Sequence, residues 1–124
     1  MTYLLVFLGG GIGAALRHGV NVGAARWLGT GFPFGTLTVN VTGSLLMGLL
    51  IAYLAFKGET SQHWRLFIAT GILGGYTTFS AFSLDVALLY ERGAIGLAVG
   101  YVLASVVLSI LALFVGLWLV RHFS

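Results

Sequence analysis

Charge, cysteine and proline are scarce in this sequence of 124 residues. With no cysteine, the chain forms no disulfide, holds no metal through thiolates and performs no thiol redox chemistry. Only 7% of its residues are charged, and the formal net charge of +3 is too small and too dispersed to indicate a nucleic-acid partner. No nucleophile stands beside a base partner, so the sequence predicts no enzyme.

Hydrophobic residues are abundant instead, at 59% of the chain with a mean hydropathy of +1.05, which is typical of an integral membrane protein. Uncharged apolar runs at 36–56, 66–84 and 93–120 are each long enough for a helix of ~17 to 25 residues that crosses a bilayer. The first apolar run is slightly short, so its helix must include Arg17 and continue toward Trp27. The sequence therefore predicts one all-α transmembrane domain over 1–124, with spans near 3–28, 34–56, 65–89 and 93–121.

Basic residues are almost evenly divided between the two ends of these spans. One end carries Lys57, Arg65 and Arg121, and the other carries Arg26 and Arg92. Because cytoplasmic loops normally show a clear excess of Lys and Arg, this near balance predicts insertion in both orientations. Two chains that pair in opposite orientations would form an antiparallel, dual-topology homodimer with its two-fold axis in the membrane plane.

The third span contains a stretch, GGYTTFSAFSLDV from Gly74 to Val86, that is poorly suited to an uninterrupted helix in lipid. Two glycines beside two threonines, Gly74 to Thr78, disfavour a helix, so we expect the span to break near its middle, within this stretch. A broken helix bares backbone carbonyls, which can ligate a cation. In the alternative interpretation, the glycines serve close helix contact and the threonines bond back to their own helix.

Phe79 and Phe82 follow the expected break at a spacing of three residues, which places both rings on one helix face with Ser80 alongside. The positive edge of an aromatic ring can face a small anion that has lost its water. This arrangement favours an anion site, and ordinary contact between two packed rings is the alternative.

Polar side chains recur at every fourth position in both the second and the fourth span. Hydroxyl and amide donors without a carboxylate make a path better suited to an anion than to a cation or a proton. Hydrogen bonds between helices are the alternative. The two stripes consist of Thr36, Asn40 and Ser44 in the second span and Tyr101, Ser105 and Ser109 in the fourth.

Arg17 is the only fixed charge that we expect deep in the membrane, and Asp85 follows Phe82 by about one helical turn. Two interpretations of Arg17 stay open: it attracts anions into a vestibule, or it extends its guanidinium to the lipid headgroups. Asp85 either pairs with a basic residue such as Arg17 or lies at the membrane interface.

Small residues recur four positions apart in three of the spans, a spacing that lets helices approach one another closely in lipid. We therefore expect close helix contacts at these positions. They are Gly9 and Gly13, Gly71 and Gly75, the set Gly96, Gly100 and Ala104, and the pair Ala112 and Gly116.

Three motifs together resemble the Fluc (CrcB) family of fluoride channels. GILGGYTTFSAFSLDV, residues 71–86, is similar to that family's third-helix signature, which is close to G-x-x-G-G-x-T-T-F-S-T-F-S-x-E. PFGTLTVNVTGS, residues 33–44, resembles its second helix, and GGGIGAALR, residues 9–17, resembles its first. The resemblance extends over essentially the whole chain in length, span count and motif order.

The resemblance implies a fold, an activity and a cofactor. Members of the family are dual-topology homodimers with two antiparallel pores, each lined by both subunits. They are fluoride-selective channels of the bacterial inner membrane, and they export fluoride passively, down its gradient. A structural sodium ion lies on the dimer axis.

The resemblance also implies roles for individual residues. Phe79 and Phe82 would be the pore phenylalanines, and Asn40 would be the pore asparagine. The backbone carbonyls of Gly74 and Thr77 would bind the sodium ion. The other residues expected along the fluoride path or its vestibule are Thr36, Ser80, Tyr101, Ser105, Ser109, Arg17 and Asp85.

Three positions depart from that family's pattern. Ala81 replaces a threonine and lacks its hydroxyl. Asp85 stands where glutamate is common, so its carboxylate extends one methylene less toward a partner in the vestibule. Tyr76 is bulkier than the common leucine, and no role for it follows from the sequence.

Two other functions are compatible with four apolar spans. A small multidrug exporter, a proton-coupled antiporter, needs a carboxylate inside the membrane to exchange protons for a cationic drug. Here Glu59 and Glu91 are predicted to lie in the connections 57–64 and 90–93, and only Asp85 is near a span. The other alternative is a non-conducting membrane scaffold whose glycines serve helix packing alone.

Overall fold

The computed structural model describes residues 1–29, 31–57 and 62–123, and the regular secondary structure in these ranges is helical. Four stretches are long and apolar enough to cross a membrane, so the prediction of an all-α protein with four apolar spans is confirmed. Residues 58–61 of the predicted second connection, with Glu59 among them, lie outside the described ranges. The elements are α1 (Thr2–Leu28), α2 (Phe34–Lys57), α3 (Gln62–Arg65), the π-helical η1 (Leu66–Leu73), α4 (Gly74–Tyr76), α5 (Ser80–Glu91) and α6 (Ile95–Phe123).

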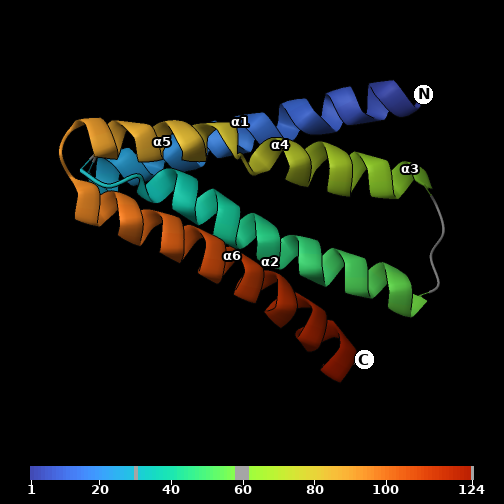
Figure 1. Ribbon diagram of the computed structural model, residues 1–124. Helices are drawn as coiled ribbons and strands as arrows, with labels where there is room; N and C mark the ends of the chain where they lie inside the picture. The colour runs from blue at the N-terminus through green and yellow to red at the C-terminus, as the bar shows by residue number, and fades with distance from the viewer. Residues whose placement is uncertain (30, 58–61, 124) are drawn as a thin grey trace.

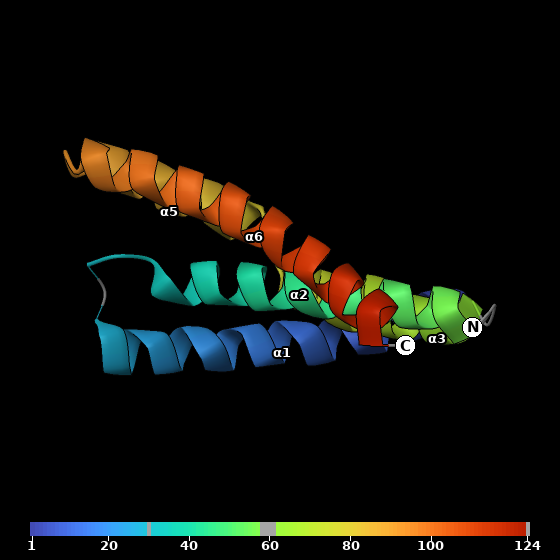
Figure 2. The ribbon, with the colours of Figure 1, turned by 90° about the horizontal axis from the view of Figure 1, so that it is seen from below.

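The helices run up and down through the molecule. Figure 1 shows the N-terminus, α3 and the C-terminus at one end, and the turns from α1 to α2 and from α5 to α6 at the other. The most extensive helix contacts are those of α2 with α6 and of α1 with η1. In Figure 2, α5 and the start of α6 diverge from α1. The two ends of the molecule thus correspond to the two sets of basic residues that the sequence distinguishes.

Glycines bring α1 into backbone contact with the third span. A Cβ added at Gly9 would lie 2.9 Å from Cα of Gly71, and one at Gly75 would lie 3.0 Å from Cα of Gly10. A Cβ at Gly13 would overlap the backbone of η1. Distances this short leave no room for a side chain, so the predicted close contact of these glycine pairs is confirmed.

The small residues of α6 divide into two groups. A Cβ at Gly116 would lie 2.7 Å from the backbone nitrogen of Leu49 in α2, which is the predicted close contact. Gly96 and Gly100 have open space where a Cβ would project, with no atom within 4 Å. These two glycines therefore make no close contact with another described helix of the chain.

The third span is interrupted after Tyr76 and not at the glycine pair. Gly74 has helical φ and ψ of −64° and −38°, and α4 continues through Tyr76. Thr77 is extended, with φ −84° and ψ 158°, and α5 begins at Ser80. The span is thus broken near its middle as expected, and the break falls on the threonines and not on the glycine pair. The glycine pair stays helical because a helix without side chains at Gly75 can lie directly against α1.

Candidate functional site

A side chain of α2 holds the interrupted segment of the third span. Asn40 donates through Nδ2 to the carbonyl oxygen of Thr78 at 3.0 Å, and its Oδ1 accepts from the Thr78 amide at 2.8 Å. Backbone that leaves a helix in lipid must find such partners for its N–H and C=O groups. Asn40 therefore closes the break, and one of its two N–H groups remains for another acceptor.

Thr78 also begins the next helix. Its Oγ1 accepts a hydrogen bond from the amide of Ala81 at 3.1 Å, which caps the first turn of α5. The same oxygen lies 3.3 Å from Oγ of Ser80. Thr78 is not among the site residues expected from the sequence, although a threonine just before an apolar helical stretch is a recognised signal for a helix start.

Two carbonyl oxygens beside the break have lost their usual helical donors. The Thr78 amide, which would donate to Gly74 in a continuous helix, donates to Asn40 instead. The Ala81 amide, which would donate to Thr77, donates to the Thr78 side chain. Gly74 and Thr77 thus present carbonyl oxygens of the kind that ligate a cation at a broken membrane helix.

Arg17 lies at the break and not beside Asp85. Its Nε donates to the carbonyl oxygen of Gly75 at 3.1 Å, and its side chain is half-buried. Asp85 accepts a hydrogen bond from Oη of Tyr101 at 3.1 Å, so the shorter acid does reach a partner. Of the two interpretations of Asp85, the one that pairs it with Arg17 is not what the structure has, because Arg17 bonds α4 and Asp85 bonds α6.

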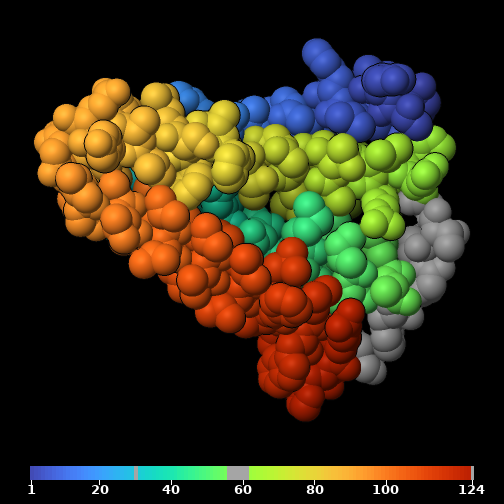
Figure 3. All heavy atoms as spheres, viewed as in Figure 1, coloured from blue at the N-terminus to red at the C-terminus, as the bar shows by residue number. Residues whose placement is uncertain are grey.

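A cavity of about 510 Å³, which we call the groove, opens where the break faces α2 and α6. In Figure 3 the hollow between the orange-to-red α6 and the yellow-green part of the third span has α2 at its floor. Gly74 and Thr77 contribute to its wall. The predicted pore residues that line the groove are Asn40, Phe79, Phe82, Ser105 and Ser109.

Ser105 and Ser109 line the groove from α6. Their Oγ atoms are buried, and neither has a hydrogen-bond partner among the described residues. Because buried polar side-chain atoms nearly always have a partner, unpartnered hydroxyls indicate a ligand, a water molecule or a neighbouring chain. With the spare N–H of Asn40, they give the groove several donors, and no carboxylate is among its lining residues.

Phe79 and Phe82 form the aromatic part of the groove. Their ring centroids are 5.6 Å apart, with 52° between the ring planes. The ring of Phe82 is held by that of Tyr101, which is fully buried and whose centroid lies 5.1 Å away. Phe79, by contrast, is 77% exposed in the isolated chain. The ring of Phe82 is therefore held against α6, whereas the ring of Phe79 faces outward.

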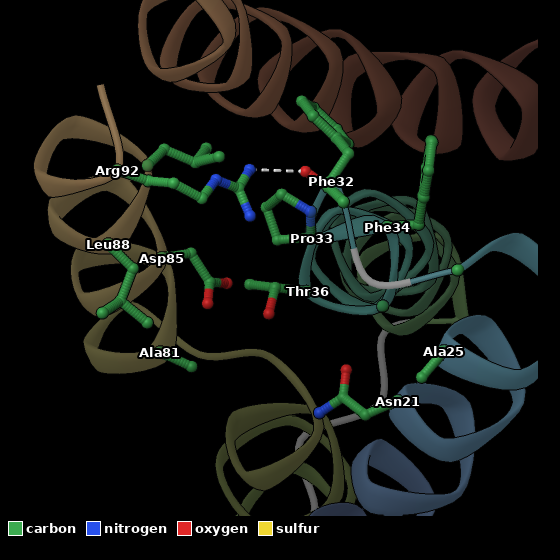
Figure 4. Close-up of a pocket in the computed structure, with 14 residues that line it drawn as sticks. Asn21, Ala25, Phe32, Pro33, Phe34, Thr36, Ala81, Asp85, Leu88 and Arg92 are labelled. Atoms are coloured by element: carbon green, nitrogen blue, oxygen red, sulfur yellow. Dashed lines mark hydrogen bonds between the residues drawn. The ribbon is translucent and has the colours of Figure 1, made fainter. Parts of the chain in front are cut away.

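A second cavity, of about 340 Å³, lies where α1 leads into α2 and α5 leads into α6, and we call it the end cavity. Figure 4 shows Asp85 of α5 and Thr36 of α2 on facing sides of it. Arg92, also in its lining, donates through Nη2 to the carbonyl oxygen of Gly31 at 2.7 Å. Ala81, which lacks the hydroxyl of the family pattern, lines the end cavity as well.

The predicted pore residues are therefore not all in one place. Thr36 lines the end cavity and not the groove. Tyr101 lies between the two cavities, since its ring contacts Phe82 and its hydroxyl bonds Asp85. Ser80 and Arg17 line neither cavity.

Four apolar spans, a helix break closed by α2 and a donor-rich groove beside that break define a multi-pass membrane protein with a polar site inside its helical bundle. The chain matches the family model described as CrcB-like protein, Camphor Resistance (CrcB), over residues 4–117, and it belongs to that family.

Proteins similar to this chain over nearly its full length carry a functional name. It is 64% identical over 124 residues, all of both chains, to fluoride-specific ion channel FluC 2 of Nitrobacter hamburgensis. It is 68% identical over 121 residues, 98% of both chains, to fluoride-specific ion channel FluC of Rhodopseudomonas palustris. It is 58% identical over 121 residues to the FluC of Granulibacter bethesdensis, which covers 98% of this chain and 95% of that one.

Proposed function

We propose that this chain is a fluoride-selective ion channel of the bacterial inner membrane, which exports fluoride passively and so relieves its toxicity. Its relatives in several bacteria are named fluoride-specific ion channels. The structural observation that carries the proposal is the groove, into which α6 directs two serines whose hydroxyls have no partner among the described residues.

The groove supplies what a dehydrated fluoride ion needs. Fluoride is small and tightly hydrated, so a pore must replace its water with several donors before the ion will pass. The hydroxyls of Ser105 and Ser109 and the free N–H of Asn40 are such donors. The rings of Phe79 and Phe82 add positive edges. Chloride is larger and is excluded by a narrow path.

The two rival functions have less support. A proton-coupled exporter would need a carboxylate in the substrate path, whereas Asp85 lies in the end cavity and is bonded to Tyr101. A scaffold held together by helix contacts alone gives no reason for buried serine hydroxyls beside a cavity.

In this proposal two chains pair in opposite orientations, and each groove becomes a pore when the second chain covers it. The 77% exposure of Phe79 supports a cover from another chain, and so do the open positions at Gly96 and Gly100. Glycines with free space beside them allow a second helix to approach closely in lipid. The near-even division of basic residues supports opposite orientations.

Adding one Lys at either end of the chain should trap the protein in one orientation, because a single charge is enough to tip a near-balanced distribution. Reporter fusions that are active only on one side of the membrane measure this. The unmodified chain should give signal from both sides and each Lys variant mainly from one. Indifference to the added charge would count against dual topology.

A structural sodium ion fits the carbonyl oxygens of Gly74 and Thr77. Both have lost their helical donors, since the Thr78 and Ala81 amides donate elsewhere. Two antiparallel chains would together offer four such oxygens near the dimer axis. Sodium bound there would hold the two breaks against each other, which is a structural role and not a step in conduction.

Replacing sodium exhaustively with a large organic cation should destabilise the purified dimer. For sodium present at about 100 times its Kd, the loss is ~2.7 kcal/mol. Thermal unfolding and fluoride flux, each measured in sodium, in potassium and in the organic cation, provide the comparison. The same unfolding temperature and flux in all three salts would mean that the two carbonyls serve only the fold.

The function itself is tested by fluoride efflux from liposomes that contain the purified protein, measured with a fluoride electrode and repeated for chloride. We expect rapid loss of fluoride without loss of chloride. Absence of fluoride efflux from a folded dimer would reject the channel function. The scaffold or the exporter would then be the next function to test.

A further inference from the structure

Tyr76, the last residue of α4, bonds α2 directly before the interrupted segment. Its Oη lies 2.9 Å from Oγ1 of Thr42. Thr42 Oγ1 in turn donates to the carbonyl oxygen of Thr38, one turn earlier in α2, at 2.6 Å. Because a hydroxyl has only one proton, Thr42 must accept at its other contact. Tyr76 is therefore the donor to Thr42.

The third span packs against Gly43 of α2 through the side chains of Tyr76 and Thr77. A Cβ at Gly43 would lie 3.2 Å from Cδ2 of Tyr76 and would overlap Cγ2 of Thr77. Three successive residues of the third span thus meet α2: Tyr76 bonds Thr42, Thr77 touches Gly43, and Thr78 bonds Asn40.

We propose that the Tyr76 hydroxyl is a positioning group for fluoride conduction, which acts through Thr42 by holding the helix break in place on α2. The inference rests on the proposed channel function. Tyr76 lines neither the groove nor the end cavity, so it does not contact the ion. The residues around it do line the groove, Gly74 two positions before and Thr77 directly after.

The break needs an attachment on each side of its extended residue. Asn40 fixes the far side, at Thr78. The Tyr76 hydroxyl fixes the near side, across the extended residue Thr77. With both sides held, the carbonyls and the aromatic ring that line the groove keep constant positions relative to the serine hydroxyls of α6. With one side released, these carbonyls and the ring change position relative to the serines. A smaller fraction of the channels then offers all of the donors to fluoride at the same time.

The test compares variants that remove or keep this one hydrogen bond. Tyr76→Phe removes only the donor. Thr42→Val removes the acceptor together with the bond from Thr42 to the Thr38 carbonyl oxygen, and Thr42→Ser keeps both bonds. Fluoride efflux from liposomes should fall about threefold in Tyr76→Phe, which is about 0.6 kcal/mol and the average contribution of one such bond in a membrane. Tyr3→Phe is the matched control, because Tyr3 is 91% exposed and far from the break in sequence.

If the hydrogen bond itself is what matters, the Thr42 variants and the double variant must also show a defined pattern of flux. Thr42→Val should lower flux as much as Tyr76→Phe, the double variant should be no worse than either, and Thr42→Ser should retain the flux of the unmodified protein. Unchanged flux in Tyr76→Phe, or independent losses that multiply in the double variant, would overturn the positioning role. If Tyr76→Phe fails to assemble, the comparison of Thr42→Val with Thr42→Ser decides. Absence of flux in the unmodified protein would instead reject the channel function and this inference with it.

Discussion

Phe82→Ile is expected to lower fluoride flux roughly tenfold while the protein stays folded and keeps the assembly of the unmodified chain. The variant keeps an apolar side chain at a half-buried position but removes an aromatic ring from the lining of the groove, and with it the positive ring edge that the proposal assigns to fluoride. It also removes the ring contacts with Phe79 and Tyr101, of which each aromatic pair contributes about 0.5–1.5 kcal/mol. A loss near 1.4 kcal/mol corresponds to the tenfold change. Liposome efflux measures the flux, and size-exclusion chromatography measures the assembly.

Phe7→Ile is the matched control for that variant. Phe7 lies in α1, is 75% exposed and lines neither cavity, so the same substitution there should leave flux unchanged. If Phe82→Ile conducts like the unmodified protein, Phe82 has no role in the fluoride path, and its contact with Tyr101 serves packing only.

Asn40→Asp should abolish measurable fluoride flux at neutral pH. The carboxylate cannot donate to the Thr78 carbonyl oxygen, so it would face that oxygen without a proton between them. It would also place a negative charge in the lining of the groove, the proposed path of fluoride. Breaking a partly buried polar contact and leaving a charge unpaired costs ~3 kcal/mol, which alone is more than a 100-fold loss.

Ser44→Asp separates the two effects of that change. Ser44 lines the same groove, and it takes no part in the bonds between Asn40 and Thr78. We expect Ser44→Asp to lower flux through its charge without lowering the unfolding temperature as far as Asn40→Asp does. Unchanged flux in Asn40→Asp would remove Asn40 from the fluoride path. Equal unfolding temperatures in the two variants would show that its bonds to Thr78 contribute little to stability.

Two of the three residues that depart from the family pattern, Ala81 and Asp85, line the end cavity. Asp85 reaches Tyr101 across the space between α5 and α6, so a shorter acid is accommodated there. Ala81 lines the same cavity from one turn earlier in α5. Neither residue lines the groove, where Phe79 and Phe82 lie.

The spacing of the motifs predicted which residues line the cavities better than it predicted how those residues are arranged in space. The stripe of Thr36, Asn40 and Ser44 suggested a single polar path, because residues four apart share one helix face. In the structure the stripe is divided, with Thr36 in the end cavity and the other two in the groove. Periodicity describes one helix, whereas the division depends on where α5 and α6 cross it.

The sequence by itself determined the four spans, the helical class and the family. Hydropathy is a sum over neighbouring residues, so a lipid-crossing helix is visible in any run of sufficient length. The glycine pairs that join α1 to the third span were also predictable, because small residues at a spacing of four leave few alternatives in a membrane.

Only the tertiary structure decided where the third span breaks and what closes the break. Gly74 and Gly75 are poor helix formers, yet they stay helical, and α1 packs directly against the backbone of Gly75. The chain leaves the helix two residues later, where Asn40 of α2 can bond both backbone groups of Thr78. A backbone group freed in lipid must be satisfied by whichever donor or acceptor the fold brings near, and that partner lies 38 residues away in the chain.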